Sequence, residues 1–267
     1  MRELERNAAD TSSPRPAHAA GPLRIGIVGA GRVGTTLVQA LGSAGHQVDG
    51  PAGRGEIPSG DAILLCVPDA EIPSASEAVA GAVPLIGHTS GATPLSALAP
   101  AGADAFGLHP LQTIAAPGAD LRGCGCGVAG DTPAALALAR RLATDLGMEP
   151  IEIADADRAA YHAAASIASN FLLTLEAAAE SVAGGAGIAA EDARRLLGPL
   201  VRTTVENWLA AGPRAALTGP VVRGDEQTVA AQRAAVAGIA PDLLALFDEM
   251  VERTGALAER RPLEVVA

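Results

Sequence analysis

The chain has 267 residues, with 19 Lys and Arg against 30 Asp and Glu, so its formal net charge is −11. An acidic chain without basic runs argues against nucleic acid and anionic membrane surfaces as partners. Hydrophobic residues make up 49% and aromatic residues only 2%, so the core must consist of Ala, Leu, Val and Ile. The length is sufficient for one large domain or two smaller ones.

The cysteines and the apolar segments bear on compartment and metal binding. Cys66, Cys124 and Cys126 are too few for the disulfide framework of a secreted protein. Cys124 and Cys126 lack the second ligand pair of a zinc site, so we expect core thiols and no metal. No segment is long and apolar enough to span a membrane, and no apolar signal sequence begins the chain. We therefore expect a soluble, cytoplasmic protein.

The glycine motif at 29–34 is preceded by a strand pattern and followed by a helix pattern. Residues 1–21, rich in Ala, Ser, Pro and charge, are typical of a disordered extension. An apolar, β-branched run at 23–28 then predicts a buried parallel strand. The motif itself has the form G-x-G-x-x-G, and the pattern over 35–41 is helical. This context is the one in which the motif binds a dinucleotide.

Each glycine of the motif has its own expected role. Gly29 permits the tight turn, Gly31 lets a pyrophosphate approach the backbone, and Gly34 allows helix and strand to pack closely. The phosphates would bind free N–H groups at the helix N-terminus, whose dipole favours anions. The expected cofactor-binding loop comprises Gly29, Ala30, Gly31, Arg32, Val33 and Gly34.

The second predicted strand, residues 45–50, bears on the choice of cofactor. NAD enzymes usually end this strand with an acid that binds the ribose 2′-hydroxyl, whereas NADP enzymes tend to supply an arginine. Asp49 lies near this position, but two more strand residues normally precede it, and Arg54 follows. Arg54, with Arg32, could pair with a 2′-phosphate, which favours NADP over NAD. The alternative is that Arg54 is a solvated loop residue.

Strands alternate with helices as far as about residue 154, which predicts a doubly wound α/β Rossmann domain over residues 22–154. A helix is expected at 72–81. A second helix has Thr132 as its N-cap, Pro133 at its first position and Gly147 after its end. The remaining strands are expected at 61–69, 83–91, 103–110, 125–129 and 149–153.

Polar side chains follow three of these strands, at the edge where parallel strands form a ligand crevice. His109 precedes Pro110, which places it at a strand end, where it could act as a general acid toward a carbonyl. A histidine that caps backbone groups is the alternative. His88 precedes its strand end and is the weaker candidate. The other expected cofactor contacts at this edge are Val67, Pro68, Asp69 and Ser90.

Strand patterns stop after about residue 154, and the change to helices alone marks a domain boundary there. We expect an all-α domain over residues 155–267. The pair Gly198–Pro199 should kink or divide one of its helices. The predicted helices cover residues 155–180, 190–211, 225–238 and 242–260.

The first of these helices carries His162, Ser166 and Asn170 four residues apart, on one face among apolar residues. A buried Asn170 would need partners, and a ligand carbonyl or carboxamide could supply them. The alternative is hydrogen bonding across a domain or dimer seam.

Arg223 lies in a polar loop before the predicted helix at 225–238. It could bind a substrate carboxylate as a bidentate partner. It could equally fix the loop by pairing with Asp225 or Glu226.

These stretches together resemble the 6-phosphogluconate-dehydrogenase-like superfamily, in which a Rossmann domain precedes an all-helical, often dimerising domain. Within it, the chain is most similar to bacterial Rossmann-like oxidoreductases that carry a poorly characterised helical C-terminal domain. The resemblance covers about residues 23–248. It is carried by G-A-G-R-V-G, L-L-C-V-P-D, H-T-S-G, G-L-H-P-L-Q-T, Y-H-A-A-A-S-I-A-S-N and L-T-G-P-V-V-R-G-D.

The resemblance also implies roles for single residues. Ser90 and His109 sit like the Ser and the His of the G-x-H-P motif in prephenate dehydrogenases. Asn170 sits like the helix Asn that follows a catalytic Lys by four positions in β-hydroxyacid dehydrogenases and ketopantoate reductase. That Lys position is Ser166 here, so His109 or His162 would have to donate the proton.

We therefore expect an NADPH-dependent reductase of a small carbonyl substrate, with 2-ketopantoate suggested by the resemblance and Arg223 on its carboxylate. Asn170 and Ser90 would orient the carbonyl. One alternative is a reductase of a cyclic imine such as a pyrroline carboxylate, which needs less help from an acid. Another is an NADP-binding regulator without turnover, which the missing Lys favours. The apolar faces of the helical half predict a homodimer.

Overall fold

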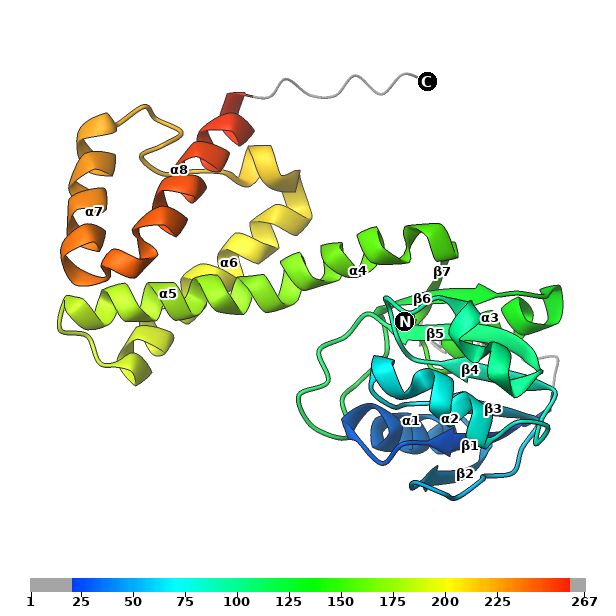
Figure 1. Ribbon diagram of the computed structural model, residues 1–267. Coiled ribbons are helices and arrows are strands. Elements are labelled where there is room, and N and C mark those ends of the chain that lie inside the picture. The colour runs from blue at the N-terminus through cyan, green and yellow to red at the C-terminus, as the bar shows by residue number, and fades with distance from the viewer. Residues whose placement is uncertain (1–20, 260–267) are drawn as a thin grey trace, which may run out of the picture. The chain divides into compact units, whose positions relative to one another are not determined.

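The computed structural model describes residues 21–259, whose strands and helices are drawn in Figure 1. The chain divides into two compact units, the first ending at Ala165 and the second beginning at Ser166. The predicted disordered extension lies, apart from Gly21, outside the described residues. Arg260, the predicted end of the last helix, also lies outside them.

The first unit contains a seven-stranded sheet in the order β2-β1-β3-β4-β5-β6-β7. Strands β1 to β5 are parallel, β6 runs antiparallel to β5, and β7 is parallel to β6. The predicted strands and the Rossmann-type α/β class are confirmed, whereas the reversal at β6 was not predicted. The strands are β1 (Arg24–Val28), β2 (Gln47–Ala52), β3 (Ala62–Leu65), β4 (Leu85–His88), β5 (Asp104–Pro110), β6 (Gly125–Gly130) and β7 (Glu149–Glu152).

Strand β2 runs further than predicted, through Pro51 to Ala52 instead of ending at Gly50. It is the edge strand of the sheet, where the missing N–H of a proline need not interrupt a ladder. The N–H of Gly29 donates to the carbonyl of Ala52 at 2.9 Å. The end of β2 is therefore fixed beside the glycine motif.

Helices cover both faces of the sheet (Figure 1). Helices α1 (Arg32–Ser43) and α3 (Pro133–Asp145) pack on one face, and α2 (Ile72–Ala78) and the 3-10 segment η2 (Leu95–Ala101) pack on the other. Strand β3 serves both cores, because its side chains alternate between the two faces: Leu64 belongs to one cluster and Ile63 to the other.

Helix α3 begins and ends where the sequence predicts. The hydroxyl of Thr132 accepts the N–H of Ala135 at 3.2 Å, which caps the first turn. Gly147 follows the helix with a φ of +73°, the left-handed conformation that favours glycine there. The capping residues were therefore enough to predict both ends of this helix.

The segment after β7 belongs with the sheet rather than with the helices that follow. The first unit includes the 3-10 turn η3 (Asp155–Asp157) and most of helix α4 (Arg158–Ser166). Arg158 is buried beside β5. The strand pattern stops near residue 154, but the division between the units comes after Ala165.

The second unit is helical, as predicted. The kink predicted at Gly198–Pro199 is wrong, because the non-helical dihedral angles inside α6 are those of Gly212, with a φ of +76°. Gly212 precedes Pro213, whose ring disfavours a helical conformation in the residue before it. The elements are the π-helical turn η4 (Ile167–Phe171), α5 (Leu172–Gly185), α6 (Ala190–Ala216), α7 (Glu226–Ile239), η5 (Pro241–Leu243) and α8 (Leu244–Glu259).

The three cysteines are free thiols, and Cys126 is buried in the core. Burial raises the pKa of Cys126 to about 12, so it stays a neutral thiol. Across residues 21–259, no group of three His, Cys, Asp or Glu side chains is placed to hold a metal ion. No helix in the same range is both long and apolar enough to cross a membrane.

Candidate functional site

The glycine motif has the conformation that each expected role requires. Gly29 has a φ of +106°, and a β-carbon there would collide with the carbonyl of Cys66. A β-carbon at Gly34 would collide with the carbonyl of Gly29, so helix and turn are in direct contact. Gly31 is the N-cap of α1 and has open space beside it. The open backbone and the uncapped helix N-terminus fit a bound phosphate.

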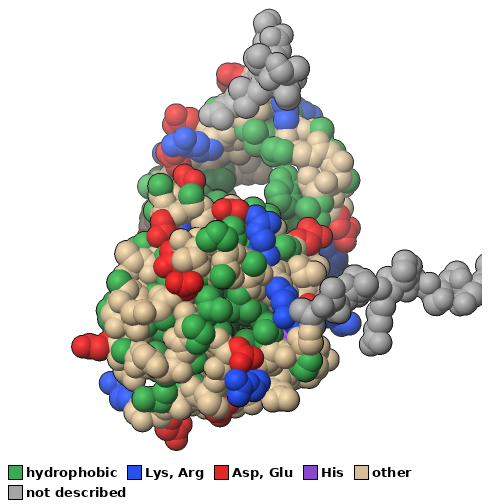
Figure 2. Space-filling view, turned by 90° about the vertical axis from the view of Figure 1, so that its right-hand side faces the viewer, with side chains coloured by type: hydrophobic (Ala, Val, Ile, Leu, Met, Phe, Trp, Pro, Cys, Tyr) green, Lys and Arg blue, Asp and Glu red, His purple; other side chains and the backbone are tan. Residues whose placement is uncertain are grey.

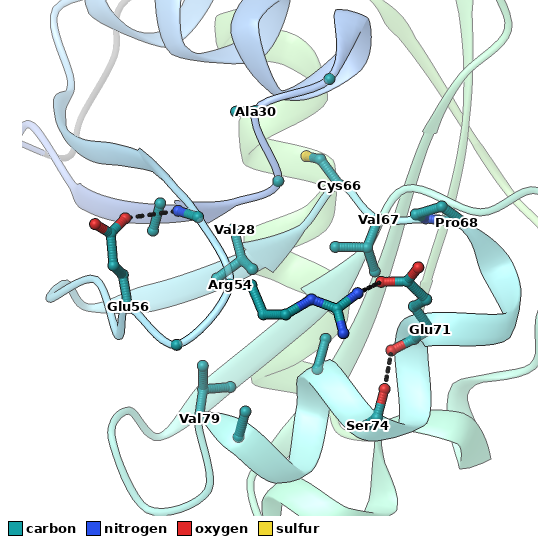
Figure 3. A pocket seen from close by; sticks show the side chains of 17 residues that line it. Val28, Ala30, Arg54, Glu56, Cys66, Val67, Pro68, Glu71, Ser74 and Val79 are labelled. Atoms are coloured by element: carbon teal, nitrogen blue, oxygen red, sulfur yellow. Dashed lines mark hydrogen bonds and ion pairs between the residues drawn. The ribbon is translucent and has the colours of Figure 1, made fainter.

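A pocket of about 430 Å³ lies on one side of this motif (Figure 3). Gly29, Ala30 and Gly31 form one wall, and the residues after β3 form another. Most of the lining is apolar, and the charged groups are Arg54, Glu56 and Glu71. Of the predicted cofactor contacts, this pocket brings together Gly29, Ala30, Gly31, Arg54, Val67 and Pro68.

Arg54, not Asp49, lies at the pocket. Asp49 pairs with Gly26 in the middle of the strand, and its carboxylate accepts both the N–H and the O–H of Ser59 at 2.8 Å. The hydrogen bonds from Ser59 hold the pKa of Asp49 below its usual value. Arg54 follows the strand end and its Nη2 lies 3.2 Å from Glu71 Oε2 (Figure 3). The side chain of Arg54 is 90% exposed, so it can reorient toward a ligand.

A second pocket, of about 200 Å³, lies at the start of α1 and the ends of β4 and β5. Arg32 and Val33 come from the glycine motif, and His109 comes from β5. Arg32 also donates to the carbonyl of Ala115 at 3.4 Å. Both pockets therefore border the glycine motif. This arrangement suits the two halves of an extended dinucleotide.

Ser90 and Asp69 line neither of these two pockets. The Ser90 hydroxyl lies 2.8 Å from Asp69 Oδ2 and 2.9 Å from Thr93 Oγ1, and it accepts the N–H of Thr93 at 2.9 Å. Ser90 is buried, so its hydroxyl is fully engaged in holding the loop after β4. These contacts give Ser90 a role in holding the loop, and its expected contact with the cofactor or a carbonyl stays a prediction.

His109 is held by the side chains of α4. Its Nδ1 lies 2.8 Å from Tyr161 Oη, and the centroids of the two rings are 5.5 Å apart. The His162 ring lies 6.1 Å away on another side. Burial, with the neighbouring His162 and Arg158 acting in the same direction and Asp69 against it, lowers the pKa of His109 to about 4. His109 is therefore a neutral imidazole at pH 7.

Arg158 supplies a buried positive charge near His109. Its side chain is 5% exposed, its Nε lies 2.6 Å from Asp155 Oδ1, and its Nη1 lies 3.4 Å from the carbonyl of Ser90. His88 is completely buried nearby and accepts the N–H of Ser90 at its Nδ1. Burial lowers the pKa of His88 to about 4. His88 is thus an uncharged structural side chain.

Ser166 and Asn170 belong to the second unit, where Asn170 differs from expectation. Asn170 is exposed, and its backbone carbonyl accepts the hydroxyl of Thr174 at 3.2 Å. Its neighbours Ile167 and Phe171 are also exposed, so the predicted buried face is wrong within the described chain. The π-helical turn over these residues also breaks the four-residue spacing that defined one face.

Arg223 lies exposed in the turn before α7. Asp225 accepts the N–H of Thr228 at 3.1 Å and its hydroxyl at 2.7 Å, and so caps α7. Arg223 forms no ion pair within 4 Å among the residues that the structure describes. Hydrogen bonds from Thr228, with a smaller contribution from the charge of Arg223, hold the pKa of Asp225 below its usual value, so both alternatives for Arg223 stay predictions.

Sequence reasoning missed four functional candidates. Tyr161 and Arg158 were not assigned roles, because nothing local connects α4 with a histidine on β5. Tyr161 is the single tyrosine of the chain and stands beside a candidate histidine, which could have drawn attention to it. Glu56 and Glu71 line the first pocket, and their sequence positions near strand ends were the available clue.

Residues 124–254 match the model of a family described as a domain of unknown function, DUF2520. No curated protein matches the chain. The matched residues include β6, β7 and most of the helical unit.

Solved structures share the whole fold at low sequence identity. Protein TM1727 of Thermotoga maritima aligns with a TM-score of 0.75 at 22% identity, covering 88% of this chain and 100% of the other. A proposed NADP oxidoreductase of Bacteroides fragilis, BF3122, aligns at 0.73 and 18%, covering 90% and 99%. A pyrroline carboxylate reductase of Plasmodium falciparum with NADP bound aligns at 0.58 and 12%, covering 89% and 98%. These similarities establish the fold.

Proposed function

We propose that the protein is an NADPH-dependent oxidoreductase that reduces a small substrate with a C=O or C=N bond. The observation that carries the proposal is the pair of pockets around one glycine motif, with Arg54 in the first and His109 in the second. The names of two similar structures, an NADP oxidoreductase and a reductase with NADP bound, support the same choice.

The cofactor would be held mainly by backbone groups and by one arginine. The N–H groups at the start of α1 would bind the pyrophosphate, with Gly31 leaving it room. Arg54 would turn from Glu71 to a 2′-phosphate, which favours NADPH over NADH. A bound nicotinamide supplies the hydride that reduces the substrate.

For a carbonyl substrate, His109 would contact the oxygen at the second pocket. His162 is the other candidate for moving a proton, since its ring lies beside His109. The resemblance suggests 2-ketopantoate as the first carbonyl substrate to test.

A specific observation supports a second substrate class, a cyclic imine such as a pyrroline carboxylate. His109 is neutral at pH 7, so the site holds little imidazolium to protonate a carbonyl. A protonated imine is already activated and needs no such acid. One similar structure is a pyrroline carboxylate reductase. The third hypothesis is a regulator that binds NADP without turnover, and Ser166 in place of the Lys favours it.

The test is loss of NADPH absorbance with purified full-length protein, run in parallel with 2-ketopantoate, a pyrroline carboxylate and no substrate. NADH serves as the cofactor control. Oxidation of NADPH with either substrate establishes the reductase and its class. Binding of NADPH without oxidation of either substrate supports the regulator, and absence of binding contradicts all three readings.

We also propose that the helical unit forms a homodimer. Few of its side chains are buried, whereas Leu209 is 71% and Trp208 is 51% exposed. Figure 2 shows one face of the molecule, with hydrophobic side chains at the surface among polar and charged ones. A helical unit with so small a core needs a partner for these residues, and a second copy is the simplest one.

A further inference from the structure

The orientation of the His109 ring is fixed by a residue 52 positions away. Tyr161 Oη lies 2.8 Å from His109 Nδ1, and the rings meet edge to face at 84°. Tyr161 comes from α4, and His109 comes from the end of β5. The contact lies entirely within the first unit. It leaves the opposite nitrogen, Nε2, as the ring's remaining polar atom.

Three glycines make room for this arrangement. A β-carbon at Gly127 would lie 2.7 Å from Tyr161 Oη, and one at Gly107 would lie 2.6 Å from Arg158 Nη2. A β-carbon at Gly91 would lie 2.9 Å from His109 Nε2. None of the three has a positive φ, so backbone conformation does not require glycine at these positions. Space for the side chains is the physical reason for these glycines.

The protonation states follow from burial and from the neighbouring charges. Burial, together with the neighbouring His162 and Arg158, lowers the pKa of His109 to about 4. Burial also raises the pKa of Tyr161 to about 12. At pH 7 the pair therefore consists of a phenol and a neutral imidazole, with two possible directions for the hydrogen bond.

The stronger donor and the stronger acceptor decide the direction. A phenol O–H is a better donor than the N–H of a neutral imidazole, and an unprotonated imidazole nitrogen is a better acceptor than a phenol oxygen. The favoured bond therefore runs from Tyr161 Oη–H to His109 Nδ1. A neutral imidazole carries one ring proton, so that proton must then be on Nε2.

We propose that Tyr161 is a positioning residue that holds His109 as the Nε2–H tautomer, so that the ring presents a hydrogen-bond donor to the second pocket. This inference refines the proposed function, and the class of ligand that it names depends on that function. A donor at Nε2 selects a substrate with an acceptor atom, such as a carbonyl oxygen. It does not pair with the N–H of a protonated imine, so it favours the carbonyl class over the iminium class.

The tautomer can be measured by nitrogen-15 NMR of the histidine rings in full-length protein at pH 7, without cofactor or substrate. The chain has five histidines, and His109→Gln identifies the resonances of His109. We expect the wild-type ring to be neutral with its proton on Nε2. In Tyr161→Phe we expect a mixture of tautomers at His109, while the other histidine resonances keep their positions.

A wild-type ring with its proton on Nδ1, or an imidazolium at pH 7, would overturn the proposal. An unchanged tautomer in Tyr161→Phe would remove the positioning role from Tyr161. If Tyr161→Phe does not fold, the wild-type spectrum alone decides the tautomer. Because the measurement uses no nucleotide, failure of NADPH to bind contradicts the proposed function and leaves this result intact.

Discussion

Arg54 Nη2 lies 3.2 Å from Glu71 Oε2, and both side chains line the pocket beside the glycine motif (Figure 3). The pair joins the loop after β2 to the 3-10 turn η1 (Asp69–Glu71). A cationic side chain at this strand end is the feature on which the preference for NADPH depends. The acid that holds it competes with a 2′-phosphate for the same guanidinium.

Arg54→Gln should weaken NADPH binding by about 10- to 100-fold, because charge-assisted hydrogen bonds to a phosphate are lost. NADH lacks the 2′-phosphate, so its affinity should stay the same. The measurement is a fluorescence titration with each cofactor. Arg122→Gln is the matched control, since Arg122 pairs with Asp120 and lies outside the pocket. Equal losses for both cofactors would contradict this role of Arg54.

Glu71→Gln should strengthen NADPH binding by up to about fivefold, because exposed ion pairs are weak and the substitution releases Arg54. The same titration measures the effect, and it should shrink as the salt concentration rises. The double variant with Arg54→Gln should bind like Arg54→Gln alone. A gain in affinity that persists in the double variant would mean that Glu71 acts on the nucleotide directly.

Gly34→Ala and Gly42→Ala should have opposite effects, although both glycines lie in α1. A β-carbon at Gly34 collides with the carbonyl of Gly29, so the loop must shift and NADPH binding should be lost. A β-carbon at Gly42 meets open space, so Ala should stabilise the helix by about 0.5–1 kcal/mol. Thermal unfolding with and without NADPH measures both effects. Normal NADPH binding by Gly34→Ala would exclude close packing as the reason for this glycine.

Stability should fall as the pH is lowered from about 6.5 to 4. Burial lowers the pKa of His88 to about 4 from an ordinary 6.5, so in this window the unfolded chain binds a proton that the folded chain excludes. The loss for His88 is roughly 3 kcal/mol when complete. Arg158 disfavours the protonated ring, whereas Asp69 and Asp155 favour it.

Urea unfolding at pH 7 and pH 5 measures this dependence. His88→Leu removes the titrating group, so the free energy of unfolding should depend less on pH in the variant than in the wild type. The same pH dependence in both proteins would show that His88 is not excluded from protonation in the fold.

The proposed homodimer should sediment at about 53 kDa, twice the 26.5 kDa of one chain. Leu209→Glu should shift the protein toward the monomer, whereas Ile57→Glu, at another exposed apolar position in the first unit, should not. Trp208 is the single tryptophan, so its emission should shift to shorter wavelength as the protein concentration rises. A monomer at all concentrations would contradict the proposal.

The sequence by itself determined those elements that depend only on residues close to one another in the chain. The glycine motif was predicted with its neighbouring strand and helix, because tight turns and close packing require glycine at fixed spacings. The boundaries of α3 followed from Thr132 and Gly147, whose capping interactions involve only adjacent residues. Apolar strand patterns likewise predicted β1 and β3 to β5, because these strands are buried on both faces.

Only the tertiary structure decided which polar groups meet. The register of β2 placed Asp49 in mid-strand, where its carboxylate accepts the N–H of Ser59. The hydroxyl of Ser90 bonds to Asp69, and Tyr161 bonds to His109, 52 residues away in the sequence. Hydrogen-bond partners of this kind depend on strand order and on helix packing. No local pattern encodes them, because they arise only when distant segments are brought together in the folded chain.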